Sequence, residues 1–378
     1  MGLQKLSDFT EIIMGQSPKG SSYNENGDGY PLLNGAADYK GQLFKPKKYT
    51  NQPTRLVEEG DILLGIRATI GNFAFADKEY CIGRGVAGIR VNAELADKNY
   101  IKRVVENELN KILHTASGST IKGIKKEDLT DMIINLPPLA TQKKIAAILD
   151  EADKLRQLGK QLIEKYDALT QSLFLDMFGD PVTNPKGWEK IPMSSLMKIV
   201  RGGSPRPIDK FLGGTYPWIK IGDATKGNDI YLESTKEHII EEGLKKTRLL
   251  PKGSLIFANC GVSLGFARIL TFEGCIHDGW LAFSEIDNKK LNEIFLLKAL
   301  NSITRYFRET APDGTQPNLN IGIMSKFEII LPPVELQNKF EKSLFEIEAQ
   351  KAQAQQSLQQ AGNLFNSLLQ KAFKGELV

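Results

Sequence analysis

The sequence predicts an α+β protein built from two related halves, each a strand-rich globule followed by a long helix. A 43-residue stretch occurs twice, at Leu136–Phe178 and Leu331–Phe373, with twelve identities at a constant offset of 195 residues. The segments before the two stretches also resemble each other, with gaps. Such self-similarity indicates an internal duplication. We therefore expect two mostly-β domains with short helices, separated by two long α-helices that pair as an antiparallel coiled coil with pseudo-two-fold symmetry.

Short runs rich in β-forming residues predict the strands of each globule, because Gly, Asn and Asp separate them at close intervals. In the first globule, residues 1–135, they cover 61–66, 72–76 and 87–91. One amphipathic helix is expected over 99–113. Its inward-facing side chains are expected to be Tyr100, Ile101, Val104, Val105 and Leu109.

The second globule, residues 181–330, repeats this pattern. Its expected strands cover 254–259, 266–271 and 280–284, and its expected helix covers 291–307. Both globules should therefore be α+β, with irregular loops large enough to carry function.

Two helical spacers are predicted at 136–180 and 331–378, and each opens with Leu-Pro-Pro. Proline disfavours a helical residue before it and is tolerated in a first helical turn, so each Leu-Pro-Pro predicts a passage from strand to helix. About 40 residues at roughly 1.5 Å each give a rod of about 60 Å. Lys351 and a glutamine-rich middle predict looser packing in the second copy. The expected packing positions are Ile145, Leu155, Leu162, Leu169, Leu173, Leu344, Ile347, Leu358, Phe365 and Leu368.

Composition bounds the possible partners of the chain. Its 378 residues contain 49 Lys and Arg against 45 Asp and Glu, a net charge of +4 that permits a nucleic-acid partner without requiring one. No apolar run long enough for a membrane span and no secretion signal occur, so we expect a cytoplasmic protein. Three Cys and three His without a CxxC motif argue against disulfides and against a metal site.

Catalytic motifs are missing from the sequence. There is no GxxxxGK[ST] phosphate loop, and neither Leu-Pro-Pro carries the flanking residues of an Asn-Pro-Pro-aromatic methyltransferase motif. Asp180-Pro181 is better explained as a helix stop than as part of a nuclease site with Glu189-Lys190. His277-Asp278 beside Cys275 is better explained as a turn than as an active site. We therefore expect no catalytic residue and no cofactor bound by this chain.

Basic, amide and hydroxyl side chains occur at matching places in the loops of both globules. Arg and Lys suit guanine edges and phosphates, Asn suits adenine, and Asp can accept from cytosine. Each one alone is more often a solvated surface group, but their agreement across two diverged copies strengthens the set. The DNA-binding candidates of the first globule are Ser17, Lys19, Asn34, Arg67, Arg84, Lys122, Lys125 and Lys126. Those of the second globule are Ser204, Arg206, Lys220, Asn259, His277 and Asp278.

Over nearly its full length the chain resembles the specificity subunits of type I restriction-modification systems. The resemblance rests on the order of several short motifs, none of them diagnostic alone. These are Leu-Pro-Pro-x-x-x-Gln at 136–142 and 331–337, the stretch GDILLGIRATIGNFAFA at 60–76, a Gly-Ser-Thr loop, Asp176-Met177-Phe178-Gly179-Asp180 and the terminal Ala372-Phe373-Lys374-Gly375-Glu376-Leu377.

The resemblance implies a non-catalytic subunit that reads a split sequence of double-stranded DNA. Each globule would be a target-recognition domain for one half-site, and the helical spacers would set the gap. Two modification subunits would methylate adenine with S-adenosylmethionine, and restriction subunits would use ATP and Mg²⁺. Two alternatives remain: a coiled-coil adaptor that binds no DNA, and an enzyme, for example a nuclease, with its own site on the loops.

Overall fold

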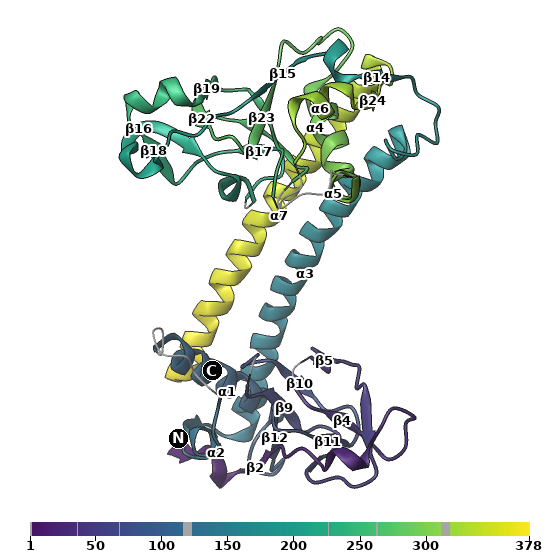
Figure 1. The fold of residues 1–378 in the computed structure, drawn as a ribbon. Helices are drawn as coiled ribbons and strands as arrows, with labels where there is room; N and C mark the ends of the chain where they lie inside the picture. The colour runs from purple at the N-terminus through teal and green to yellow at the C-terminus, as the bar shows by residue number, and fades with distance from the viewer. Residues whose placement is uncertain are drawn as a thin grey trace. The chain divides into compact units, whose positions relative to one another are not determined.

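The computed structural model describes residues 2–35, 37–67, 69–115, 123–225, 227–261, 264–310 and 318–378 (Figure 1). The chain forms two compact units. Unit 1 comprises Met1–Gly159 with Ser357–Val378, and unit 2 comprises Lys160–Gln356. The two long helices, α3 (Leu139–Phe178) and α7 (Val334–Lys374), each contribute one part to each unit. The α+β class and the two long helices predicted from the sequence are confirmed.

Unit 1 contains two main sheets. An antiparallel sheet has the order β10-β9-β12-β2, and a mixed sheet has the order β3-β7-β4-β11-β8. The strands of the first sheet are β2 (Thr10–Met14), β9 (Ile62–Gly65), β10 (Phe73–Phe75) and β12 (Val86–Val91). Those of the second are β3 (Tyr23–Asn24), β4 (Tyr30–Leu33), β7 (Lys48–Thr50), β8 (Leu56–Val57) and β11 (Tyr80–Ile82). The remaining elements are β1 (Gly2–Lys5), β5 (Tyr39–Lys40), β6 (Leu43–Phe44), β13 (Ile133–Leu136), α1 (Lys98–Thr115), α2 (Lys126–Thr130), η1 (Leu6–Asp8) and η2 (Gly20–Ser22).

Unit 2 repeats this plan with small differences. Its sheets have the orders β15-β23-β20-β21-β17 and β18-β16-β22-β19, and β14 pairs with β24 as β1 pairs with β13. The strands of the first sheet are β15 (Lys198–Arg201), β17 (Tyr231–Leu232), β20 (Leu255–Ala258), β21 (Ala267–Leu270) and β23 (Trp280–Ser284). The remaining strands are β14 (Lys190–Pro192), β16 (Leu212–Ile219), β18 (Glu237–Ile239), β19 (Arg248–Leu250), β22 (Gly274–Ile276) and β24 (Glu328–Ile330).

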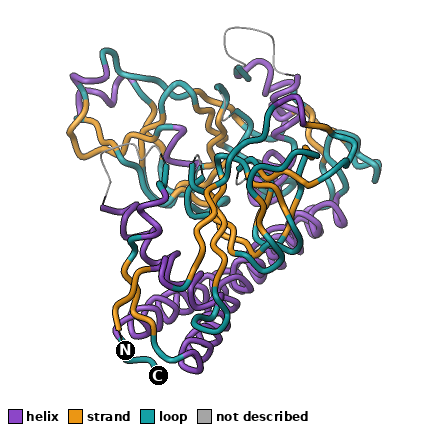
Figure 2. The backbone as a smooth tube through the Cα atoms, turned by 90° about the horizontal axis from the view of Figure 1, so that it is seen from below, coloured by secondary structure: helices purple, strands orange, loops and turns teal. Residues whose placement is uncertain are grey.

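The helices of unit 2 differ from the prediction at one place. The helix expected over 291–307 is two helices, α4 (Glu293–Ser302) and α5 (Thr304–Thr310), separated by Ile303. The side chain of Asn292 caps α4 by accepting hydrogen bonds from the N–H groups of Ile294 and Phe295. The other helices are α6 (Ile321–Lys326), η3 (Met193–Ser195), η4 (Ile208–Lys210), η5 (Ile221–Thr225) and η6 (Glu241–Lys246). Figure 2 shows how much of each unit consists of loops between short strands.

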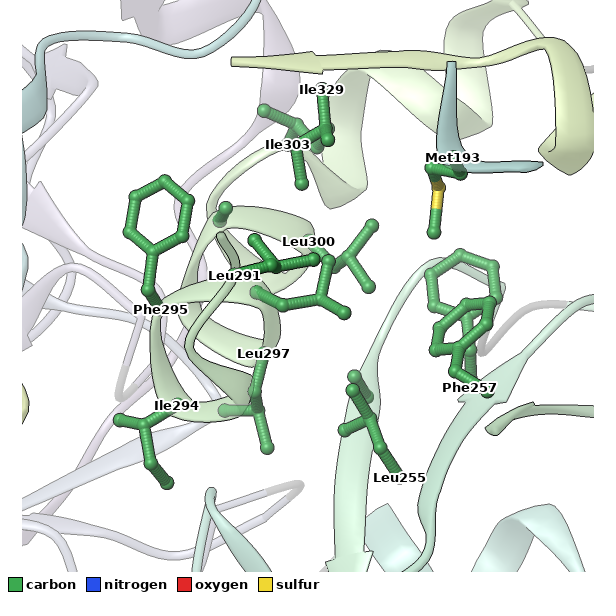
Figure 3. Close-up of a cluster of buried hydrophobic side chains, with 14 of the residues drawn as sticks. Met193, Leu255, Phe257, Leu291, Ile294, Phe295, Leu297, Leu300, Ile303 and Ile329 are labelled. Carbon is green, nitrogen blue, oxygen red and sulfur yellow. The ribbon is translucent and has the colours of Figure 1, made fainter. Parts of the chain in front are cut away.

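Each unit has its own apolar core between a sheet and a helix. In unit 1, α1 buries Tyr100, Ile101 and Leu109 against the strands β9 and β12, as predicted. In unit 2, α4 is buried nearly all round, and Leu291, Leu297 and Leu300 face Leu255 and Phe257 of β20 (Figure 3). Burying a large apolar side chain contributes about 1.5 to 3 kcal/mol. These cores hold the loops at the sheet ends in fixed positions.

Within each unit, the parts of α3 and α7 pack antiparallel. In unit 1, the Arg156 guanidinium lies 4.4 Å from the ring centre of Phe365, and a Cβ added to Gly159 would lie 3.2 Å from Cδ1 of Leu358. In unit 2, the rings of Phe174 and Phe178 lie 5.5 and 5.4 Å from that of Phe340. In both units, later residues of α3 therefore meet earlier residues of α7, which agrees with the predicted antiparallel pairing.

The packing face of α3 differs from the expected one. Leu155, Leu162 and Leu169 are 54%, 43% and 48% exposed, and therefore do not form the helix contact. The contact uses positions next to these leucines: Ala152, Arg156, Gly159, Ile163, Tyr166 and Thr170 are buried or half-buried. The leucines misled the prediction because a small residue and polar residues occupy the inner face.

The other expected packing positions lie on the inner faces. Ile145, Leu344 and Phe365 are buried, and Leu173, Ile347, Leu358 and Leu368 are half-buried. The Lys351 side chain is only 14% exposed, and its Nζ lies 2.5 Å from Oδ1 of Asp167. A charged pair thus occupies the middle of this seam, where the sequence predicted looser packing.

The repeated Leu-Pro-Pro-x-x-x-Gln motif fastens each long helix to its globule. The fully buried Gln142 donates from Nε2 to the carbonyls of Pro137 and Leu95, and its Oε1 accepts from the N–H of Asp97. Gln337 makes the same three bonds with Pro332, Lys290 and Asn292. One amide thereby satisfies three backbone groups at the junction of strand, helix and loop.

Candidate nucleic-acid interface

In each unit one parallel pair of strands organises the loops. In unit 1, β4 runs parallel to β11, with Leu32 opposite Cys81 and Leu33 opposite Ile82. In unit 2, β16 runs parallel to β22, with Trp218 opposite Cys275. The carboxyl ends of parallel strands lie at the same edge of a sheet. The residues that follow the two strands are thus brought together in each unit.

A third loop reaches the same edge because a glycine lets it cross close to the backbone. After β2, a Cβ on Gly15 would lie 2.1 Å from the carbonyl oxygen of Gly83. After β15, a Cβ on Gly202 would lie 2.2 Å from the carbonyl oxygen of His277. Both distances are too short for any side chain. Glycine at these two places therefore brings the Ser-Pro loops, with Ser17 and Ser204, beside the strand ends.

The resulting cavity of unit 1 has a volume of about 470 Å³ and unites four of the predicted DNA-binding residues. Its lining includes Ser17, Asn34, Arg67 and Arg84, which come from the three loops and the end of β9. Asn34, Arg67 and Arg84 are exposed. Within the described part of the chain, neither guanidinium makes a hydrogen bond or an ion pair. Arg67 and Arg84 thus place two cations, without partners among the described residues, at the same cavity.

The lysine candidates of unit 1 lie outside this lining. Lys19 is exposed just before the short helix η2. Lys125 and Lys126 are exposed at the start of α2, where the backbone N–H of Lys125 donates to Asp128. This segment approaches the cavity through Gly123, where an added Cβ would be 3.6 Å from Cγ of Arg67. Lys122 lies outside the described residues.

Unit 2 has a cavity of about 540 Å³ at the matching place, again lined by four predicted residues: Ser204, Arg206, Lys220 and His277. Its remaining lining consists of Pro205, Pro207, Ile208 and Trp218. The unit 2 cavity thus has more apolar lining residues, whereas Ser17, Asn34, Arg67, Thr69 and Arg84 make most of the unit 1 lining polar in residue type. Comparing the two halves of the sequence did not predict this apolar lining, although Trp218 directly follows the aligned Tyr-Pro pair of the second half.

Asp278 is held by its neighbours, while 45% of its side chain stays exposed. The Ser204 hydroxyl donates to its carboxylate at 2.7 Å, and Nη2 of Arg206 lies 3.4 Å from Oδ2. The hydrogen bond from Ser204 lowers the pKa of the Asp278 carboxyl. Nε of Arg201 also donates to the Asp278 carbonyl oxygen at 2.8 Å. Asp278 therefore anchors the Ser-Pro loop to the strand end.

Lys220 and His277 also interact with other groups of the same unit. Nζ of Lys220 lies 2.6 Å from a carboxylate oxygen of Glu237. Nδ1 of His277 accepts from the N–H of Gly279 at 2.7 Å, and burial lowers the pKa of the ring. The unit 2 cavity therefore presents fewer free polar groups than the unit 1 cavity.

Asn259 corrects a prediction, because it is fully buried and offers no surface to DNA. Its backbone N–H donates to the carbonyl of Gly279, and its carbonyl accepts from the N–H of Leu319. Its Nδ2 donates to Oδ1 of Asn318 at 3.3 Å. Asn259 thus ties the end of β20 to a neighbouring segment. The aligned Arg67 is exposed, so sequence position alone did not reveal the difference.

Two further properties hold for the residues that the structure describes. None of their helices is long and apolar enough to cross a membrane. No group of three or more His, Cys, Asp or Glu side chains among them is arranged to hold a metal ion.

Comparisons with known proteins agree on one family. The family model described as the type I restriction modification DNA specificity domain matches the chain twice, at residues 2–166 and 185–361. The putative type I restriction enzyme MjaX specificity subunit of Methanocaldococcus jannaschii is 39% identical over 170 residues, which are 44% of this chain and 40% of that protein. The HindI specificity subunit of Haemophilus influenzae is 21% identical over 432 residues, covering 90% of this chain and 94% of that one.

Solved structures show the same fold. The S subunit of a type I restriction-modification system from M. genitalium matches 98% of this chain and 96% of its own, with a TM-score of 0.57 and 18% identity. A chain from a study of complex assembly and conformational transition of the type I R-M system matches with a TM-score of 0.67 and 18% identity, covering 100% of this chain and 98% of that one.

Proposed function

Because the chain belongs to the family of type I restriction-modification DNA specificity proteins, we propose that it reads a bipartite target in double-stranded DNA, one half-site per unit. The observation that carries the proposal is the pair of cavities at the same topological place, each lined by four residues expected to bind DNA. The duplication preserved the loop scaffold and changed the side chains on it. Two half-sites of different sequence follow from this.

The chemistry of each cavity suggests how its half-site is read. In unit 1, the unpaired guanidiniums of Arg67 and Arg84 suit the O6 and N7 acceptors of guanine, or phosphate oxygens. In unit 2, Pro207 and Ile208 suit an apolar contact such as a thymine methyl group. Lys125 and Lys126 at the start of α2 suit phosphates, which position a protein without reading sequence.

The long helices and the partners complete the proposal. Helices of 40 and 41 residues would fix the gap between half-sites. Two modification subunits would supply methylation with S-adenosylmethionine, and restriction subunits would supply the ATP- and Mg²⁺-dependent steps. This chain would act without catalytic residues of its own. The names of the relatives support this division of labour, since they are called specificity subunits of restriction enzymes.

The test maps methylated sites after reconstitution with the modification subunits. Arg84→Ala and Arg67→Ala are expected to relax one half-site only, since a bidentate contact discriminates by about 1 to 3 kcal/mol. Arg206→Ala and Lys220→Ala should affect the other half-site. Arg305→Ala serves as the control, because this exposed arginine of α5 pairs with Glu309 away from the cavities. An unchanged site in all four loop variants would refute the assignment.

Two simpler assays address the alternatives. An adaptor without DNA binding predicts no salt-dependent gel shift with long duplex DNA in the presence of a modification subunit. A nuclease with its own site predicts that the purified chain cuts plasmid DNA with Mg²⁺. The comparisons give no support to the adaptor.

A further inference from the structure

A second kind of cavity lies in unit 2, away from the loops that carry the proposed DNA contacts. It has a volume of about 560 Å³ and lies between α3, α4 and α7. Thr170 and Phe174 of α3, Lys298 of α4, and Glu348 and Lys351 of α7 are among its lining residues. All belong to unit 2.

The duplication shows what fills the corresponding space in unit 1. At the offset of 195 residues, Thr170 matches Phe365. The Phe365 side chain is 7% exposed, and its ring lies 4.4 Å from the Arg156 guanidinium and 5.7 Å from that of Arg103. A threonine in place of this phenylalanine removes the ring. The cavity is thus a difference between the two copies rather than a general feature of the fold.

The cations around the space match in the two units. Arg103 matches Lys298, Arg156 matches Lys351, and both cations of each unit lie beside carboxylates. Unit 2 therefore keeps a cation at both places. The carboxylates differ, because Asp150, which pairs with Arg103, corresponds to Phe345.

Four carboxylates and two ammonium groups line the cavity, so negative charge is in excess. Lys298 lies 2.7 Å from Asp229, and Lys351 lies 2.5 Å from Asp167. Glu348 is 3.9 Å from the already paired Lys351, and its side chain is only 18% exposed. Asp180, at the rim, accepts hydrogen bonds from two backbone N–H groups. Burial raises the pKa of Glu348, and a bound cation would offset that burial.

A second observation points to a ligand in the same place. Thr170 is 8% exposed, and its Oγ1 has no hydrogen-bond partner among the described residues. A buried hydroxyl without a partner costs about 1 to 3 kcal/mol, so such groups are rare. This hydroxyl lines the cavity and can accept a hydrogen bond from an occupant.

We propose that this cavity binds one organic cation, a guanidinium or primary ammonium group, between the Glu348 carboxylate and the Thr170 hydroxyl. The group comes either from a free polyamine or from a basic side chain of another protein. Both sources offer N–H donors to the two acceptors and a positive charge to the Glu348 carboxylate, whose pairing with Lys351 is long at 3.9 Å. The proposal does not depend on the reading of DNA.

Calorimetry on the full-length protein without DNA tests the proposal. Putrescine represents the free polyamine, and the peptide amide Gly-Arg-Gly represents the side chain, with Gly-citrulline-Gly amide as its neutral counterpart. We expect saturable binding of one equivalent of one cationic probe and none of the neutral peptide. A preference for putrescine identifies a free polyamine, whereas a preference for the peptide identifies a protein side chain.

Two variants locate the binding. Thr170→Phe restores the ring that unit 1 carries, and Glu348→Gln removes the negative charge of this side chain with little change of shape. Each should weaken binding at least tenfold. Leu162→Phe adds similar bulk at an exposed position of the same helix and should leave binding unchanged. The proposal is overturned if neither cation binds the wild-type protein saturably, or if Glu348→Gln and a folded Thr170→Phe bind as the wild type does.

Discussion

At Gln142 and Gln337, a single buried amide joins the globule of each unit to the helix that follows it. The three backbone groups bonded by Gln142 belong to Leu95, Asp97 and Pro137. Backbone groups buried without partners are costly, so the amide is hard to replace. The spacing from the proline pair to the glutamine thus has a structural cause, independent of DNA.

Gln142→Leu is expected to destabilise unit 1 by about 2 to 4 kcal/mol, because it leaves buried backbone groups without partners. Hydrogen exchange of α1 and β13 should report the loss locally. Gln157→Leu, at an exposed position of α3, is the control and should change stability by less than about 0.5 kcal/mol. Equal effects of the two substitutions would contradict the role assigned to Gln142.

His277 should make the stability of unit 2 depend on pH, and the sign of this dependence follows from its surroundings. Burial lowers the pKa of its ring, although the carboxylate of Asp278 lies 3.6 Å from Nδ1 and opposes the shift. Protonation would place a hydrogen on Nδ1 against the N–H of Gly279. The folded state therefore favours the neutral ring.

Since the folded pKa is depressed, the stabilisation by His277 should be complete above the unfolded pKa of about 6.5 and lost as pH falls through the folded pKa. Urea unfolding of the wild type between pH 7.5 and 5 should show this loss. His277→Asn should flatten the dependence, while His238→Asn, outside the cavity lining, should preserve it. A wild-type slope that survives in His277→Asn would assign the titration to another group.

At the scale of elements, the two long helices differ in the types of residue on their inner faces. In α7 the buried positions Phe340, Leu344, Ala354 and Phe365 are apolar or small. In the middle of α3 the inner face includes Arg156, Gly159 and Thr170, whereas Leu155, Leu162 and Leu169 occupy outer positions. A surface rich in exposed leucines on a helix suits contact with another protein.

Leu344→Ala is therefore expected to destabilise unit 2 by about 2 to 5 kcal/mol, because the leucine is fully buried and its loss opens a cavity. Leu162→Ala, a chemically identical change at a 43% exposed position, should cost much less. Thermal unfolding of both variants measures the difference. A similar loss at the two positions would show that the outer face of α3 is packed as well.

For the whole molecule, the duplication explains how one chain can hold two different sites. The two sheets, the parallel strand pair and the glycine crossing recur in both units. The side chains at the cavity differ, with Asn34 and Arg84 in unit 1 and Lys220 and His277 in unit 2. Divergence at these positions leaves the core unchanged, so recognition can change without loss of the fold.

Changing the lengths of α3 and α7 tests whether these helices set the gap between the two half-sites. A matched seven-residue insertion in α3 and α7 keeps the helical face nearly in register and adds about 10 Å. The gap of the methylated target should then grow by about three base pairs, at about 3.4 Å each. Sequencing of methylated sites measures it. Matched insertions in the exposed loop at Gly41 serve as the control, and an unchanged gap in the spacer variant would exclude a ruler role for the helices.

The sequence by itself determined the duplication, the fold class and the start of each long helix, because proline placement and hydrophobic periodicity are local properties. It also found half of the residues that line the two matching cavities. The tertiary structure alone decided that Asn259 is buried, that Asp278 anchors a loop, and that Leu155, Leu162 and Leu169 lie on the outer face of α3. These outcomes depend on which distant segments lie opposite each residue, such as Leu319 opposite Asn259, and no local pattern encodes that pairing.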